Sequence, residues 1–300
     1  MNSFSKLTLV TENDDFVSRV NKLTSLSRER VRHTFGEISW PDKIDTEAWW
    51  LPPELLSVHG TRYEQEMSLE QKKLLSKWEC INLFSLNVEG ERELVSRLSS
   101  RLYQPEVPGL ENYLHHFIDE ENKHMWFFGE FCRRYGGKIY SSKKMAIAEE
   151  TYSPEMEYFL LFARIGIFEE IGAYFNVAAA SDERMDPFVR QIHQIHHADE
   201  ARHITFGRAL LAQTKELAFA SSSAEQRDRA IAHLQRYVQI SVEALYQPAM
   251  YRDSGISSGV AMRRELLNDG ARRKLHEESF LKRPLRFFAD LGIHLTANPQ

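Results

Sequence analysis

Two copies of a carboxylate–histidine pattern, about eighty residues apart, carry the clearest chemistry in this sequence. The copies are Glu120-Glu121-Asn122-Lys123-His124 and Asp199-Glu200-Ala201-Arg202-His203. Positions i and i+3 share one face of a helix, so the second acidic residue and the His of each copy can bind one metal ion together. Each copy follows a stretch with another Glu about thirty residues upstream. Two such helix pairs predict a dinuclear carboxylate site inside a four-helix bundle.

The first copy lies on an apolar face of its expected helix. Glu121 and His124 share a stripe with aromatic and aliphatic residues, namely Leu110, Phe117, Phe128 and Phe131. Solvated charges belong on the opposite face of an amphipathic helix. A buried carboxylate costs several kcal/mol unless it is paired or bound to a metal ion. Metal binding explains both the burial and the spacing.

The second copy has an additional histidine. His196, Glu200 and His203 are spaced i, i+4 and i+7, which places three candidate ligands on one helix face. Such a set is more specific than a single Glu-x-x-His. We interpret the flanking His193 and His197 as core or surface histidines.

The upstream acidic residues leave two choices open. Glu169 and Glu170 are adjacent in a segment that is apolar nearly all round, and they point about 100° apart. The small residues one turn from Glu169 favour it, with Glu170 as the competitor. Glu91 shares a stripe with apolar residues and is preferred to Glu89, which points to the other side.

The acidic residues that precede the two Glu-x-x-His motifs suggest a crossed arrangement. A histidine that binds a metal through one ring nitrogen usually donates the hydrogen of the other to a carboxylate or carbonyl. The internal pseudo-symmetry predicts that Asp199 accepts from His124 and that Glu120 accepts from His203.

Prolines, glycines and caps divide the chain into long helical segments. The expected helices span about 12–34, 68–103, 110–135, 153–180, 186–218, 224–246 and 258–278, with Pro284 after the last. Residues 40–60 are expected to form an irregular connection. No segment shows a convincing alternation typical of strands. The predicted fold is all-α, a ferritin-like four-helix bundle core with additional helices, and residues 1–300 are expected to form a single domain with its metal-binding core at about 70–210.

Composition excludes several classes of protein. A net charge of −5 gives no basic footprint for nucleic acid. Cys80 and Cys132 form no CxxC motif or disulfide framework, and the sequence shows no signal peptide. The longest apolar stretch, about 159–175, is interrupted by charged residues and predicts a buried helix instead of a membrane span. These features favour a cytoplasmic protein.

The combined motif resembles the non-haem diiron N-oxygenases of the para-aminobenzoate N-oxygenase family, which have a ferritin-like bundle. The third histidine distinguishes that family from plain ferritin-like diiron proteins. The ligands that the resemblance implies are Glu91, Glu121, His124, Glu169, His196, Glu200 and His203. It covers roughly residues 70–210, and Glu120 stands where the pattern has Asp, a chemically mild change.

The resemblance implies an oxygenase with two iron ions and dioxygen as co-substrate, and manganese is the alternative metal. The substrate would be a small aryl amine or amino-acid-derived amine, oxidised at nitrogen to hydroxylamine, nitroso or nitro products. Electrons would come from an external donor, because the sequence has no flavin or nicotinamide motif. A homodimer is the expected assembly. The alternatives are a diiron hydroxylase or desaturase acting on carbon, or a ferritin-like iron-binding protein.

Overall fold

The computed structural model describes residue 10 and residues 13–103, 109–141 and 152–297. These residues form helices joined by turns, and none of them belongs to a β-strand. The nearest approach to one is an isolated parallel bridge between Trp49 and Met185. The prediction of an all-α fold is confirmed. No helix in the described part of the chain is long and apolar enough to cross a membrane.

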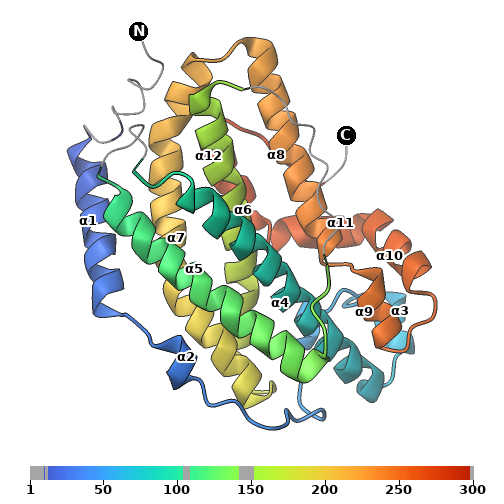
Figure 1. The fold of residues 1–300 in the computed structure, drawn as a ribbon. Coiled ribbons are helices and arrows are strands. Elements are labelled where there is room, and N and C mark those ends of the chain that lie inside the picture. The colour runs from blue at the N-terminus through green and yellow to red at the C-terminus, as the bar shows by residue number, and fades with distance from the viewer. Residues whose placement is uncertain (1–9, 11–12, 104–108, 142–151, 298–300) are drawn as a thin grey trace.

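Four long helices form the core: α4 (Leu69–Ser99), α5 (Glu111–Phe131), α6 (Pro154–Ser181) and α7 (Pro187–Ala220). Helix α4 packs along α5, and α6 packs along α7, so the core consists of two helical hairpins laid against each other (Figure 1). The four-helix core expected from the repeated motif is therefore present.

Local chemistry explains where these helices begin and end. Ser68 and Gln71 form a capping box at the start of α4. The Ser153 side chain caps α6, with Pro154 in the first turn, and Asp186 caps α7. The turn after α5 ends at Gly137, whose φ of 67° suits a residue without a side chain.

Shorter helices surround this core. Helix α1 (Asp14–Glu29) packs on α5 and α7, and α8 (Ala224–Ala244) packs on α6 (Figure 1). The remaining helical segments are α2 (Thr34–Glu37), η3 (Pro53–Leu55), α3 (Arg62–Glu66), η4 (Cys132–Gly136), α9 (Pro248–Asp253), α10 (Gly259–Asn268), α11 (Gly270–Glu278) and α12 (Lys282–Asp290). The last of these contacts α6.

The structure corrects the sequence-based boundaries at both ends. The first helix ends at Glu29. The expected helix over 258–278 is two helices, because Asp269 adopts an extended backbone and its side chain caps the second of them, α11. Helix α12 was missed because Pro284 suggested a break. Pro284 lies in the first turn of α12, where a helix needs no backbone N–H from it.

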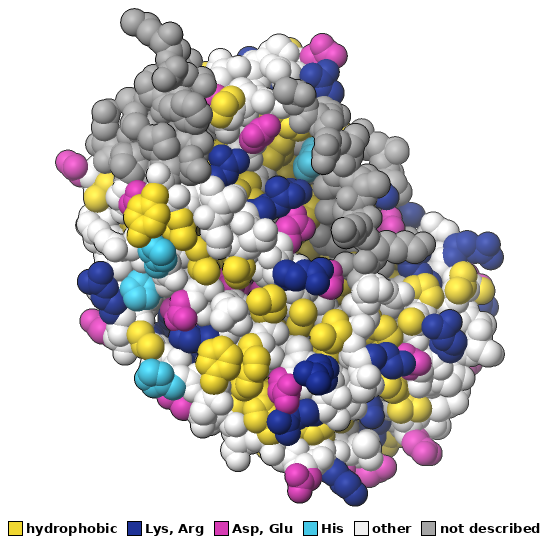
Figure 2. All heavy atoms as spheres, in the orientation of Figure 1, with side chains coloured by type: hydrophobic (Ala, Val, Ile, Leu, Met, Phe, Trp, Pro, Cys, Tyr) yellow, Lys and Arg dark blue, Asp and Glu magenta, His cyan; other side chains and the backbone are white. Residues whose placement is uncertain are grey.

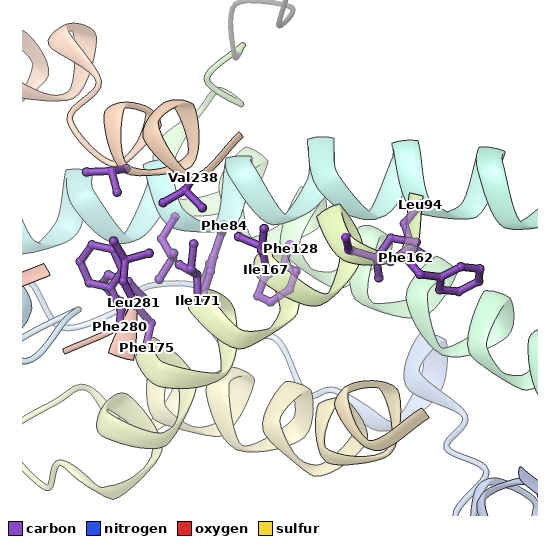
Figure 3. Packing of buried hydrophobic residues seen from close by; sticks show 14 of the residues in the cluster. Phe84, Leu94, Phe128, Phe162, Ile167, Ile171, Phe175, Val238, Phe280 and Leu281 are labelled. Atoms are coloured by element: carbon purple, nitrogen blue, oxygen red, sulfur yellow. The ribbon is translucent and has the colours of Figure 1, made fainter. Parts of the chain in front are cut away.

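Apolar side chains from all of the long helices fill the bundle interior. Phe84 of α4 and Phe128 of α5 contact each other with ring centroids 4.6 Å apart, and Ile167 and Ile171 approach from α6 (Figure 3). This packing encloses a group of acidic and imidazole side chains at the centre of the four helices.

Candidate metal centre

All seven side chains implied by the sequence lie together in the bundle interior. Glu91 comes from α4, Glu121 and His124 from α5, Glu169 from α6, and His196, Glu200 and His203 from α7. Each of them is at most 3 % exposed to solvent. Four helices that are far apart in the chain thus converge on one buried polar cluster.

The seven residues form two groups with the geometry of metal sites. The first group contains Glu91, His124 and His196, and the second contains Glu121, Glu169, Glu200 and His203. Within each group, one candidate ligand atom from every residue lies within 4.8 Å of the others. Each group could hold one metal ion.

Glu121 and Glu200 lie between the two groups. Glu121 Oε2 is 3.3 Å from His124 Nδ1, and Glu121 Oε1 is 2.7 Å from His203 Nδ1. Glu200 Oε1 and Oε2 are each 3.3 Å from the Nδ1 atoms of the same two histidines. Each carboxylate therefore faces an imidazole of both groups and could contribute to metal binding in either of them.

The structure also separates the residues between which the sequence left a choice. Glu91 has no exposure, whereas Glu89 pairs with Arg92 at the protein surface. Glu169 belongs to the second group, whereas Glu170 forms an ion pair with Arg208. The preferred residue of each pair lies in the cluster.

The crossed arrangement is present. Asp199 Oδ2 accepts a hydrogen bond from His124 Nε2 at 3.2 Å, and Glu120 Oε2 accepts one from His203 Nε2 at 2.8 Å. Because a carboxylate only accepts, it keeps the hydrogen of each ring on Nε2. The Nδ1 atoms of both rings face the cluster, where they could bind metal ions in place of a proton.

Sequence analysis missed one residue that holds Asp199 and Glu120 in place. Arg202 is 4 % exposed and donates hydrogen bonds to Glu120 Oε1 at 2.7 Å and to Asp199 Oδ1 at 2.8 Å. Its Nε also donates to Ser27 Oγ of α1. The sequence did contain a signal for this role, because Arg202 is a basic residue inside the second motif, on a helix expected to face the core. The first motif has Lys123 at this position, and Lys123 pairs with Asp119 instead.

His193 is a core histidine, as interpreted from the sequence. It is fully buried, packs against Phe84 with ring centroids 5.0 Å apart, and lies outside both candidate groups. Its Nδ1 donates to Asn176 Oδ1 at 2.8 Å. Asn176, a second residue that the sequence did not indicate, also contacts His196. His197 is only partly buried and belongs to neither group.

Crowded carboxylates dominate the electrostatics of the cluster. Burial and the neighbouring Glu121 raise the pKa of Glu91 well above its usual value. Burial and the charges of Glu200 and Glu121 do the same for the pKa of Glu169. Burial alone would lower the pKa of His203, but Glu121 and Glu200 raise it well above its usual value. Without a metal cation, protons supply the positive charge that these carboxylates require.

Unpaired oxygen atoms show that the cluster fits metal ions. Both carboxylate oxygens of Glu91, and Oε1 of Glu121, Glu169 and Glu200, are buried without a hydrogen-bond partner among the described residues. Buried polar atoms are normally paired, so this concentration needs an explanation. Carboxylate and imidazole are suitable ligands for iron and manganese. Cations at the centre of the cluster would pair these atoms.

The fold and the cluster define a class: ferritin-like helical bundles with paired carboxylate–histidine groups. Comparison with family models narrows this class. The model of the p-aminobenzoate N-oxygenase AurF family matches residues 14–292, and the chain belongs to that family. It is therefore an N-oxygenase enzyme, and the match extends well beyond the 70–210 expected from the motifs. No curated protein matches the chain in a search of such proteins.

Proposed function

We propose that this protein is a diiron N-oxygenase that oxidises the nitrogen of a small aryl or amino-acid-derived amine. The observation that supports this most strongly is the pair of buried Glu and His groups, in which both carboxylate oxygens of Glu91 have no hydrogen-bond partner among the described residues. Glu91, His124 and His196 would hold one iron, and Glu169 and His203 the other. Glu121 and Glu200 would contribute to both.

The iron pair would supply dioxygen activation, and the protein residues create the conditions for it. Phe117 stacks on His203 with ring centroids 4.1 Å apart, and Phe128 packs against His196 at 4.8 Å. These rings exclude water from the cluster. Asp199 and Glu120 fix the ring orientations of His124 and His203. No residue of the cluster is placed to supply electrons, so an external donor is part of the proposal.

A groove of about 2300 Å³ lies beside α4 and α6, the helices that carry Glu91 and Glu169, and none of the seven candidate ligands lines it. It is lined by residues of α4, α6, α8 and α10. Basic, acidic and hydrophobic side chains are interspersed on the face of the molecule drawn in Figure 2. Gly90 and Phe168 line the groove and directly precede Glu91 and Glu169 in sequence. We infer that the substrate nitrogen approaches the metals past these two residues.

The Phe168 ring fills the space next to Gly90 in this groove. A Cβ atom added to Gly90 would lie 2.4 Å from Phe168 Cζ, so only glycine leaves room for the ring in this position. Tyr237 of α8 also lines the groove and is partly buried, and burial raises its pKa well above the usual value, which keeps its hydroxyl neutral. Near Phe168 the groove is therefore lined by a glycine, an aromatic ring and a neutral hydroxyl, with Arg164 and Glu93 also in its lining.

The proposal is tested by metal content and reaction together. The purified protein, reconstituted anaerobically with Fe²⁺, should hold two irons per chain. With reductant and dioxygen it should convert an arylamine such as p-aminobenzoate to an N-oxygenated product. Carbon-oxidised products would support the hydroxylase or desaturase alternative. Many irons per chain would support a storage protein, and one or none would contradict the dinuclear site. Reconstitution with Mn²⁺ in parallel tests the alternative metal.

Two further expectations belong to this proposal. We expect a homodimer, which light scattering on the purified protein would detect as about twice the mass of one chain. We also expect residues 1–300 to unfold in one cooperative transition as a single domain. Separate transitions in calorimetry would contradict the second expectation.

A further inference from the structure

The groove beside α4 and α6 contains an arginine with few partners. Arg164 of α6 lines the groove, and only 15 % of its side chain is exposed to solvent. Its Nε is buried without a hydrogen-bond partner among the described residues. Glu93 Oε1 lies 3.8 Å from one of its terminal nitrogens, which is too far for a hydrogen bond. Buried polar groups are normally paired, so this guanidinium group needs an explanation.

A second arginine already pairs with the same glutamate. Arg97 Nε donates to Glu93 Oε1 at 2.8 Å, and this is the oxygen that faces Arg164. Two guanidinium groups thus share one carboxylate, which leaves one positive charge without a counter-charge among the described residues. Burial and the charge of Arg97 lower the pKa of Arg164, and Glu93 offsets this only in part. The group nevertheless stays protonated at neutral pH.

Arg202 illustrates how a structural arginine of the same protein is paired. Its Nε donates to Ser27, and one of its terminal nitrogens donates to both Glu120 and Asp199. Two carboxylates therefore balance its single charge. Arg164 has no carboxylate of its own, and a bound anion would supply the acceptors that it lacks.

The lining of the whole groove is rich in positive charge. Its described residues include eight arginines but only four glutamates, with no lysine or aspartate, whereas the chain has a net charge of −5. A cleft lined by charge of one sign concentrates ligands of the opposite sign. The groove therefore attracts anions, and the arginines that share Glu93 have donors left to bind one.

Two successive levels of the groove are formed by matched residues of α4 and α6. Phe168 meets Gly90 at the inner level, and Arg164 faces Glu93 at the outer level. Arg164 and Phe168 are four residues apart on α6, and Gly90 and Glu93 are three apart on α4, so each pair shares a helix face. The levels are about 5 to 6 Å apart, because a helix rises about 1.5 Å per residue.

This separation sets the length of a molecule that could reach both levels. It is about one helical turn, which is the length of a six-membered ring with substituents at opposite ends. An amine with an acidic group at that distance would hold the acid beside Arg164 and its nitrogen beside Phe168. Phe168 directly precedes the candidate ligand Glu169 in sequence, so the nitrogen would lie at the end of the molecule nearer to the cluster.

We propose that Arg164 is a specificity-determining residue, which together with Arg97 binds the anionic group of the substrate and thereby selects amines that carry a carboxylate or a phosphate. The inference rests on the proposed function, because it assigns one end of that enzyme's substrate. Guanidinium groups bind carboxylate and phosphate through the same paired hydrogen bonds, so the chemistry is shared. Glu93 competes with the substrate for both arginines.

Calorimetric titration of the full-length, iron-loaded protein tests this binding without turnover. Benzoate and phenyl phosphate carry the two anionic groups, and benzamide is the neutral counterpart of benzoate. One of the two anions should bind wild type at least about tenfold more tightly than benzamide, and the tighter one identifies the anionic group that the groove selects. Equal affinity for all three probes, or no binding of either anion, would overturn the proposal.

Three variants separate a binding arginine from a structural one. Arg164→Met keeps the apolar stem but removes the charge, and should weaken binding of the preferred anion roughly 10- to 100-fold. Glu93→Gln removes the competing carboxylate and should tighten that binding roughly threefold. The matched control is Arg92→Met, which removes an arginine of the same groove that pairs with Glu89. It should change the affinity by less than about twofold.

The opposite signs expected for Arg164→Met and Glu93→Gln decide between the two roles. Equal weakening of anion binding in both variants would show a structural ion pair and overturn the proposal. Unchanged binding in Arg164→Met would also overturn it, since the probe would then bind elsewhere, for example directly to iron. If Arg164→Met does not fold, Arg164→Lys should still weaken binding roughly tenfold, because lysine keeps the charge but lacks the paired donors.

Turnover separates this inference from the proposed function. Arg164→Met should raise KM for p-aminobenzoate with little change in kcat, and should leave KM for p-aminobenzamide unchanged. N-oxygenation of both amines by wild type with equal KM would contradict the inference alone. Selective binding of an anion without any N-oxygenated product would instead contradict the proposed function and leave the anion site supported.

Discussion

The bundle holds two buried carboxylate networks, and they differ in how their oxygen atoms are paired. At the metal centre, both oxygens of Glu91 have no hydrogen-bond partner among the described residues. Where α4 packs against α9, Glu79 accepts hydrogen bonds from the backbone N–H of Ser57 at 3.0 Å and from its hydroxyl at 2.5 Å. Tyr251 in turn donates to the Ser57 hydroxyl at 2.9 Å.

The comparison shows that burial of an acidic residue is not evidence for a ligand site. Glu79 is also buried, at 7 % exposure, yet its carboxylate oxygens accept hydrogen bonds from protein groups, so its network is complete. The metal centre is incomplete without cations. Unpaired oxygens next to imidazole nitrogens distinguish a site from a structural network, and each of the following changes tests that distinction.

The largest effect should come from a ligand substitution with an adjacent control. Glu169→Ala should reduce the iron content from two per chain to one or none, and N-oxygenation to below about a hundredth of wild type, since even residues that support a ligand contribute 10- to 100-fold. Glu170 is next to Glu169 on α6 and pairs with Arg208 of α7. Glu170→Ala should therefore remove that ion pair but keep two irons. Metal analysis and product assay check both variants. Two irons in Glu169→Ala would contradict the assignment.

A smaller effect is expected for the cation that supports the centre. Arg202→Met leaves Glu120 and Asp199 without their shared partner, so the free energy of unfolding should fall by about 3 kcal/mol. Iron affinity should fall roughly tenfold at the same time. Chemical denaturation and metal titration measure the two effects. Lys123→Met, at the equivalent position of the first motif, should change either quantity little.

The complete network should respond to pH but not to metal. Burial raises the pKa of Glu79 to about 7, from an ordinary value of 4.5, and Ser57 opposes this only in part. The folded state therefore retains a proton that the unfolded state releases. Stability from this group is fully present below pH 4.5 and is lost as pH rises through about 7, by about 3 kcal/mol in total.

The pH effect is isolated by comparison with a neutral isostere. The free energy of unfolding of Glu79→Gln relative to wild type should increase by about 3 kcal/mol between pH 4.5 and 8, with or without iron. Glu91→Gln should behave similarly without iron but become destabilising once iron is bound. If iron changes the result for Glu79→Gln, the two networks are not independent.

The metal centre, unlike the Glu79 network, should depend on access for a substrate, and Phe168 is the side chain that tests this. Phe168→Ala widens the inner end of the groove and should change KM for the amine about tenfold, equivalent to roughly 1.4 kcal/mol of binding. Iron content should remain two per chain. Steady-state kinetics with arylamines of different width provide the measurement, and an unchanged KM for all of them would place the substrate route elsewhere.

The smallest effect on metal content and stability is expected for Glu89, the residue of α4 that was the alternative to Glu91. Glu89 forms a surface ion pair with Arg92, and such pairs contribute less than about 0.5 kcal/mol. Glu89→Ala should keep two irons and change the free energy of unfolding by less than that amount. Loss of an iron in this variant would restore Glu89 as the alternative to Glu91.

Local signals in the sequence determined the four core helices and most of the candidate site. The Glu-x-x-His spacing, the caps Ser68, Ser153 and Asp186, and the glycine pair after α5 depend on neighbours within a few residues. Such signals can be read without the fold. They failed at Asp269, which ends α10 and caps the start of α11. They also failed at Pro284, which lies in the first turn of α12 instead of marking the end of a helix.

Only the tertiary structure decided which side chains support the cluster. Arg202, Asn176 and His193 act through partners 82, 20 and 17 residues away, and no periodic pattern encodes those distances. Local patterns favoured Glu91 over Glu89 and Glu169 over Glu170, but only the packing of the helices placed the favoured residue of each pair in the cluster. A helix repeat specifies which residues share a face, but the packing of four helices specifies which faces meet and which polar atoms are left for a metal.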